Sequence, residues 1–258
     1  MNNSLLIQLF DLSGRVAIVT GGASGIGAGI SCQLAIAGAT VIVADIDISA
    51  GQSFAKELCS EGASAIAIQL DISNEDVVKS CFEDISREHG APWILVNNAG
   101  IQNRKGMFEI SGDDWDAMQK VNLRGAFLCL REAAELMKYE GQGGRIINIS
   151  SASIRHPTTE GLAAYAASKG GLASLSQNAA FELLEHNITV NTILPGGVMT
   201  PGALGATGPA PSAAAQRRPP LGQCTPEDIA MATLFFASPA AQHITAQQLA
   251  VDGGWQLT

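Results

Sequence analysis

The stretch VAIVTGGASGIG, residues 16–27, decides the fold of this chain. Its first five residues are apolar or β-branched, as in a strand that is buried on both faces. Glycines follow, and the chain continues as AGISCQLAIAG, which favours a helix. Glycines at a strand-to-helix turn let the backbone bend tightly and approach a pyrophosphate, whose charge the helix N-terminus favours. The stretch therefore predicts a dinucleotide-binding turn with contacts from Gly21, Ser24, Gly25, Ile26 and Gly27. A tight turn without a ligand is the alternative.

The same succession of strand and helix recurs along the chain. Apolar, β-branched runs occur at 16–20, 40–44, 63–70, 93–96, 145–150, 188–194 and 247–251, with helical segments between them. Buried strands that alternate with helices indicate a parallel sheet with right-handed crossovers and helices on both faces. We therefore expect one α/β domain over residues 1–258, with a doubly wound, mainly parallel, seven-stranded Rossmann-type sheet. In this architecture ligands bind beyond the carboxyl ends of the strands.

Composition restricts the partners of the chain. The net charge is −9, and no run of lysine or arginine is longer than a pair such as Arg217 and Arg218, which argues against binding to nucleic acid or to anionic lipid. The five cysteines form no CxxC pair and the four histidines show no HExxH spacing, so neither disulfides nor a metal is expected. No apolar run is long enough to cross a membrane, and the N-terminus lacks a basic leader. We expect a cytoplasmic protein that binds small molecules.

One segment interrupts the alternation of strands and helices. TPGALGATGPAPSAAAQRRPPLGQ, residues 200–223, is rich in Gly, Pro and Ala and has no clear period. A long loop inside a compact domain is usually either a functional lid or a disordered insertion. The sequence therefore predicts a substrate lid at 200–222.

Acidic residues follow the second and third predicted strands. Asp45 lies 18 residues beyond Gly27, where a carboxylate can accept hydrogen bonds from an adenosine ribose and would repel a 2′-phosphate. Neither the glycine turn nor ADID contains a lysine or arginine for such a phosphate, which favours NAD over NADP. Asp47 is the alternative residue for the ribose. Asp71 and Ile72 are placed to meet the adenine edge, although Asp71 could equally be an ordinary helix N-cap.

The fourth predicted strand ends in VNNAG, residues 96–100. An amide pair and a small-residue turn stand there at the carboxyl end of a strand, where a bound dinucleotide crosses the sheet. Turn chemistry alone could explain Asn97 and Asn98. We expect cofactor contacts from Asn98, Ala99 and Gly100.

A tyrosine and a lysine are four residues apart in AAYAASKGG, residues 163–171. A phenol has a pKa near 10, so it is a poor base at neutral pH unless a nearby cation stabilises its anion. Lys169 lies one helical turn beyond Tyr165, on the same face, and can supply that charge. The pair is therefore a candidate proton donor with its activator. The alternative is two polar groups on a helix.

Together these motifs resemble the short-chain dehydrogenase/reductase family. TGGASGIG, Asp45, NNAG, Asn122, the Ser-Ser pair after RIINI, YAASK and PGGVMT occur in the order and approximate spacing of that family. The resemblance runs from Gly14 to Trp255. It implies that Tyr165 takes the proton of an alcohol and that Lys169 also holds the nicotinamide ribose. It further implies that Asn122 completes a water-linked proton path to the lysine.

The resemblance also assigns contacts to the substrate and to the nicotinamide. A serine after the fifth strand would hydrogen-bond the substrate oxygen. Ser151 precedes Tyr165 by 14 residues, one more than in many relatives, which leaves Ser153 as a rival. His156 stands between the serines and Tyr165 and is a candidate substrate contact. The PGGVMT turn resembles the nicotinamide contact of the family, through Pro195, Gly196, Val198 and Thr200.

Two further departures from the family pattern concern packing. Pro92 and Trp93 replace the polar-acidic pair that commonly precedes ILVNNAG, and Ala246 stands where relatives have glycine. The sequence is thus interpreted as an NAD(H)-dependent alcohol dehydrogenase or ketone reductase for a small secondary alcohol or ketone. The resemblance implies a homo-oligomer, a tetramer. A 3-oxoacyl thioester reductase and a non-catalytic dinucleotide-binding protein are the alternatives. Asp45 and the acidic net charge argue against the first alternative, and the presence of Tyr165 and Lys169 argues against the second.

Overall fold

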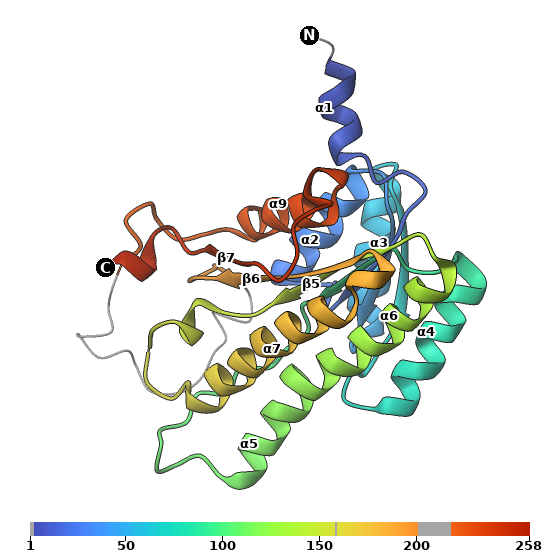
Figure 1. The fold of residues 1–258 in the computed structure, drawn as a ribbon. Helices are drawn as coiled ribbons and strands as arrows, with labels where there is room; N and C mark the ends of the chain where they lie inside the picture. The colour runs from blue at the N-terminus through green and yellow to red at the C-terminus, as the bar shows by residue number, and fades with distance from the viewer. Residues whose placement is uncertain (1–2, 158, 201–217) are drawn as a thin grey trace.

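Seven parallel strands form one sheet in the order β3-β2-β1-β4-β5-β6-β7 (Figure 1). The computed structural model describes residues 3–157, 159–200 and 218–258. The strands are β1 (Val16–Thr20), β2 (Thr40–Asp45), β3 (Ser64–Gln69), β4 (Ile94–Asn97), β5 (Gly144–Ile149), β6 (Ile188–Pro195) and β7 (Gln248–Val251). Each predicted run coincides with one of these strands to within one residue at either end, which confirms the doubly wound sheet.

Helices cover both faces of the sheet. They are α1 (Asn3–Phe10), α2 (Gly25–Ile36), α3 (Ile48–Ser60), α4 (Glu75–His89), α5 (Gly112–Gln119), α6 (Ala126–Glu140), α7 (Ala163–Glu182) and α9 (Pro226–Ala237), with the π-helix η1 (Lys120–Gly125) between α5 and α6. Short 3₁₀ helices are η2 (Ala152–Ile154), η3 (Leu184–His186), η5 (Pro239–Ala241) and η6 (Trp255–Leu257). Figure 1 shows α2, α3 and α9 on one face and α4, α6 and α7 on the other. Two buried apolar clusters fill the spaces between these layers and the sheet.

The position of a strand in the sheet decides how deeply it is buried. β1, β4, β5 and β6 are buried along their whole length because strands flank them and helices cover them. The edge strands β3 and β7 have no fully buried residue. The expectation that every run is buried on both faces was therefore wrong for 63–70 and 247–251, since each of these strands has a neighbour on one side only.

The direction of the chain reverses across the sheet beside β1. The chain runs outward from β1 through β2 to β3, then returns to place β4 on the other side of β1. The carboxyl ends of β1 and β4 therefore lie side by side, and this is where doubly wound sheets bind ligands. The glycine turn after β1 and the VNNAG turn after β4 meet at this point.

Three further features complete the fold. Ala246 adopts φ 59°, so the position where relatives have glycine does use the left-handed conformation. Most of the predicted lid, residues 201–217, lies outside the described residues. In the described parts of the chain, every helix is too short or too polar to span a lipid bilayer.

Candidate active site

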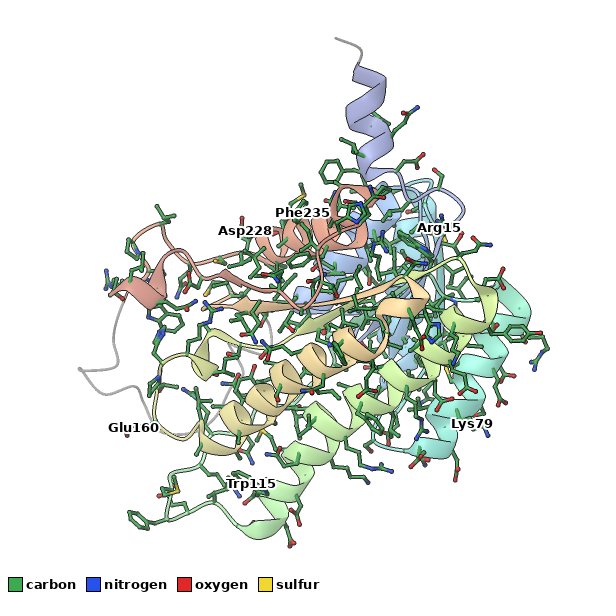
Figure 2. The ribbon with its side chains drawn as sticks, viewed as in Figure 1. Arg15, Lys79, Trp115, Glu160, Asp228 and Phe235 are labelled. Carbon is green, nitrogen blue, oxygen red and sulfur yellow. The ribbon has the colours of Figure 1, made fainter. Side chains whose placement is uncertain are left out.

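A cavity of about 1030 Å³ opens at the carboxyl edge of the sheet. It brings together most of the residues that the sequence singled out: Gly21, Ser24, Gly25, Ile26, Gly27, Asp45, Asp71, Ile72, Asn98, Ala99, Gly100, Ser151, Ser153, Tyr165, Lys169, Pro195, Gly196, Val198 and Thr200. Asn122 and His156 are outside this lining. Figure 2 shows Glu160, in the segment before α7, far from Arg15, which precedes β1 at the opposite edge of the sheet.

The glycine turn is fixed by its own geometry and by a neighbouring strand. Gly21 and Gly25 have φ 61° and 53°, which favour glycine. A Cβ at Gly27 would lie 1.9 Å from the Gly21 carbonyl oxygen, so the start of α2 packs directly on the turn. Asn98 Nδ2 donates to the carbonyl oxygens of Thr20 and Gly21, each at 3.0 Å. Asn98 therefore holds the turn in place, a role that its position after a strand did not reveal.

Asp45 keeps acceptor capacity at the end of β2. Its Oδ2 accepts from Ala23 N and its Oδ1 from Asp47 N, both at 3.1 Å. A carboxylate has about four acceptor sites, so both oxygens can accept further hydrogen bonds from ribose hydroxyls. The carboxylate of Asp47 instead caps α3, accepting from the backbone amides of its first turn. The geometry thus favours Asp45 over Asp47 as the ribose acceptor.

The end of β3 shows a similar separation of roles. Asn74 is the N-cap of α4, and its side chain accepts from Val77 N. Asp71 accepts from Ser73 N at 2.9 Å and lines the cavity with Ile72. The alternative reading of Asp71 as the helix N-cap is therefore wrong, because Asn74 occupies that position.

Tyr165 and Lys169 project from the first turns of α7 into the cavity. Lys169 is 4% exposed, and its Nζ donates to the Ile149 carbonyl oxygen at 2.8 Å. The same Nζ lies 5.9 Å from the centroid of the Tyr165 ring. Burial lowers the pKa of Lys169 to about 8. Burial raises the pKa of Tyr165, and a hydrogen bond with Ser151 opposes that rise.

The two candidate serines are hydrogen-bonded to each other. Ser151 caps η2, and its Oγ accepts from Ser153 N at 3.2 Å and from Ser153 Oγ at 2.9 Å. Ser151 also hydrogen-bonds Tyr165, so it stands between Ser153 and the phenol. Both serines line the cavity, and Ser153 is the more buried. Ser151 is thus in direct contact with the tyrosine, whereas Ser153 contacts Ser151.

Asn122 lies behind the cavity, in the π-helix η1. Single π-turns within helices are uncommon and often occur at functional sites. The Asn122 side chain is fully buried and exchanges hydrogen bonds with the backbone of Ile101, at 2.8 and 2.9 Å. Its Nδ2 also donates to Ser168 Oγ, which donates to the Tyr165 carbonyl oxygen. Asn122 thus connects the loop after β4 to α7.

His156 packs behind the cavity wall. Its ring meets the edge of Trp255, with ring centroids 6.0 Å apart. Trp255 lines the cavity and is held at the start of η6 by its backbone amide, which donates to the Asp252 carbonyl oxygen. The sequence reasoning missed Trp255 as a cavity residue, because its segment carries no motif and reaches the site only through tertiary packing.

Other cavity residues were also missed. They come from the loops after β4, β5 and β6 and from the segment before α7, and include Gln102, Arg104, Thr159, Leu162, Met199 and Gln223. For Gln102, Arg104 and Met199 the available signal was their position shortly after strands in an open α/β sheet. The structure adds that Lys105 N donates to the Gly161 carbonyl oxygen, which joins the loop after β4 to the segment before α7.

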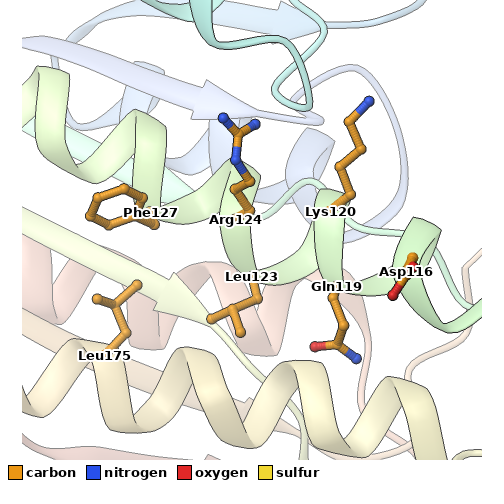
Figure 3. A pocket seen from close by; sticks show the side chains of 7 residues that line it. All are labelled: Asp116, Gln119, Lys120, Leu123, Arg124, Phe127 and Leu175. Atoms are coloured by element: carbon orange, nitrogen blue, oxygen red, sulfur yellow. The ribbon is translucent and has the colours of Figure 1, made fainter.

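A second pocket lies on the outer surface of the helices (Figure 3). Its volume is about 560 Å³, and α5, η1, α6 and α7 form it. Leu123, Phe127 and Leu175 face this hollow, and Arg124 and Lys120 stand at its rim (Figure 3). It shares no residue with the larger cavity.

Comparisons with known proteins find similar chains over nearly the whole length of this one. The family model described as enoyl-(acyl carrier protein) reductase matches residues 21–256. The chain is similar to the short chain dehydrogenase/reductase astE of Aspergillus oryzae, with 37% identity over 97% of this chain and 98% of the relative. It is 36% identical to the 2,5-dichloro-2,5-cyclohexadiene-1,4-diol dehydrogenase LinX of Sphingobium indicum, over 95% of this chain and 98% of the relative. The 3-ketoacyl-(acyl-carrier-protein) reductase of Brucella melitensis, solved with NADH, has a TM-score of 0.87 and 33% identity, over 95% of this chain and 100% of that chain.

Proposed function

This chain belongs to the short-chain dehydrogenase/reductase family of oxidoreductases, and from that premise we propose that it transfers a hydride between NAD(H) and a small secondary alcohol or its ketone. One observation carries the proposal. Tyr165, Lys169 and Ser151 meet in the same cavity as the glycine turn and Asp45. A dinucleotide lying across the carboxyl edge therefore ends beside a candidate proton donor.

The residues present fit a nicotinamide dinucleotide. The turn after β1 supplies a helix N-terminus for the pyrophosphate, and Asp45 keeps acceptor sites for the adenosine ribose. Lys169 would hold the nicotinamide ribose, and Pro195, Gly196, Val198 and Thr200 line the same cavity as candidate nicotinamide contacts. When bound, the nicotinamide would accept or supply the hydride.

The chain's own residues would handle the proton. Tyr165 would take the proton from the substrate hydroxyl, and Ser151 Oγ would hydrogen-bond the same substrate oxygen. The phenol needs help, because burial raises its pKa in the structure as it stands. Lys169, when charged, would stabilise the phenolate, and its Nζ lies 5.9 Å from the centroid of the Tyr165 ring. Asn122 would continue the proton path through water behind the lysine.

Preference for NAD over NADP is supported by the carboxylate at the end of β2. Asp45 would repel a 2′-phosphate, and the residues that line the cavity beside it, Ser24, Gly25 and Ile46, are uncharged. The NADH-bound relative from Brucella melitensis is a 3-ketoacyl-(acyl-carrier-protein) reductase, so use of NADH does not by itself exclude that alternative. The net charge of −9 argues against it, because it is poorly suited to an acidic carrier protein.

We also propose that the chain forms a homo-oligomer, a tetramer. The surface pocket on α5, α6 and α7 supports this assembly, because it presents Leu123, Phe127 and Leu175 at the surface (Figure 3). The cytoplasmic location expected from the sequence stays a prediction.

The experiment offers cyclic, aromatic and polyol secondary alcohols with NAD⁺ and records absorbance of the reduced cofactor. We expect Tyr165→Phe to lower kcat by roughly 10² to 10⁴ while NAD binding stays nearly intact, because only the ionisable hydroxyl is removed. Tyr139→Phe is the matched control, since Tyr139 is the other tyrosine of the chain and is 92% exposed on α6. An active Tyr165→Phe enzyme would show that the proton donor lies elsewhere.

A further inference from the structure

The charged residues of the cavity separate by sign along the sheet. Among the described residues, four charged side chains line the cavity: Asp45, Asp71, Arg104 and Lys169. The two carboxylates follow β2 and β3, on one side of β1. Arg104 follows β4, on the other side, and Lys169 extends from α7. The half of the cavity that would receive the substrate is therefore positive, although the protein as a whole carries a charge of −9.

Lys169 is the more buried of the two cations in this positive half. Its Nζ is buried and donates to the Ile149 carbonyl oxygen, beside Tyr165. Arg104 is the second cation among the described residues that line the cavity, and it is half-buried rather than fully exposed. A guanidinium holds a carboxylate with two parallel hydrogen bonds, and partial burial strengthens that attraction relative to water.

The backbone places Arg104 next to the segment that leads into α7. Lys105 N donates to the Gly161 carbonyl oxygen at 3.3 Å, and a Cβ at Gly161 would lie 3.2 Å from the Arg104 carbonyl carbon. This contact joins the Arg104 loop to the segment 159–162, only a few residues before Tyr165. Thr159 in that segment lines the cavity, and its buried Oγ1 has no hydrogen-bond partner within the described chain. A ligand oxygen near Arg104 could satisfy this hydroxyl.

We propose that Arg104 binds a carboxylate of the substrate, so that the substrates are hydroxy acids and the corresponding oxo acids. The inference rests on the proposed hydride transfer and narrows its substrate class. Arg104 acts as a specificity residue, holding the acid group while Tyr165 faces the carbinol carbon. Glu160 belongs to the segment 159–162, but its side chain is exposed and does not line the cavity, so it leaves the positive sign of this half unchanged.

The first test compares acids with neutral counterparts of the same shape. The substrates are 3-hydroxybutyrate against its methyl ester, and gluconate against sorbitol, each with NAD⁺. We expect the wild type to favour an acid over its neutral counterpart by at least about tenfold in kcat/KM. Arg104→Gln should lower kcat/KM for the acid by about 10- to 100-fold, mainly by raising KM. Rates with the neutral members should change less than about threefold. Lys105→Gln is the matched control, because this variant removes the same charge from a neighbouring residue. The Lys105 side chain lies outside the cavity, where it pairs with Asp114 at 2.7 Å.

A second test separates the failure of this inference from the failure of the proposed reaction. Binding of the same acids to Tyr165→Phe with NAD⁺ is measured by saturation-transfer NMR, which needs no turnover. Acid binding that Arg104→Gln abolishes would support the carboxylate site even if no alcohol is oxidised. The inference is overturned if the neutral members bind or react as well as the acids, or if Arg104→Gln and Lys105→Gln have equal effects.

Discussion

Replacing Lys169 by methionine should stabilise the cofactor-free protein at neutral pH while abolishing turnover. Burial lowers the pKa of this lysine from its ordinary value of 10.5 to about 8, so its charge is disfavoured in the folded state. That difference corresponds to about 3 kcal/mol. Loss of the hydrogen bond to the Ile149 carbonyl oxygen costs about 1 kcal/mol. Lys169→Met should therefore gain about 2 kcal/mol, or roughly 4–8 °C in Tm.

The stability gained by Lys169→Met should decrease as the pH rises. Below pH 8 the lysine is charged in the folded and unfolded states, and the full cost of burying the charge is present. Between pH 8 and 10.5 the folded protein releases the proton and the unfolded chain keeps it, so the cost fades as pH rises. The advantage of Lys169→Met should vanish near pH 10.5 and leave only the missing hydrogen bond.

The assay is differential scanning calorimetry of both proteins, without cofactor, at a series of pH values from 6.5 to 10.5. Other titrating groups are common to both proteins and cancel in the difference. Lys138→Met provides the control, because Lys138 is exposed on α6, and its Tm should differ little from wild type at any pH. A Lys169→Met protein that is less stable at pH 7, or whose difference from wild type does not vary with pH, would refute the reasoning.

Three further outcomes are expected. Ser151→Ala should cost at least tenfold more activity than Ser153→Ala, because Ser151 itself hydrogen-bonds Tyr165; the reverse ranking in folded variants would make Ser153 the catalytic serine. The wild type should prefer NAD over NADP at least tenfold in kcat/KM, about 1.4 kcal/mol, and Asp45→Ala should narrow the ratio; equal or better use of NADPH would contradict this. Gly27→Ala should lower Tm strongly, since its Cβ would lie 1.9 Å from the Gly21 carbonyl oxygen, whereas Gly170→Ala, with nothing within 4 Å of its Cβ, should not; thermal denaturation of the two variants distinguishes them.

The parts of this molecule that sequence could predict are those set by local patterns. Apolar runs located each strand, and the glycines after β1 marked the turn, because backbone conformation and burial period act over a few residues. The distinction between Asp71 and Asn74 as the cap of α4 could not be predicted. Both residues are good N-caps, and the choice depends on where the helix starts.

The residues that sequence missed reach the site through tertiary contacts. Arg104 is positioned by the hydrogen bond between Lys105 N and Gly161, whose partners are far apart in the chain. Trp255 is positioned by the backbone of Asp252 and by the ring of His156. None of these contacts produces a periodic pattern or a fixed spacing in the sequence. A motif can therefore identify Tyr165 and Lys169 without identifying the residues that line the cavity around the substrate.

The pairing of β1 with β4 bears on how the chain folds. Ile18 pairs with Leu95, so β4 can pair with β1 only by closing a long loop that contains β2 and β3. Such non-local parallel pairing slows folding, because the entropy cost of closing the loop comes before the strand contacts that offset it. During synthesis the first three strands emerge before β4, so one edge of β1 is unpaired. Its free backbone groups can then pair with the wrong strand or with another chain. We expect the yield of refolding to fall at this step when the protein concentration is high. Early folding of α4 should reduce this loss.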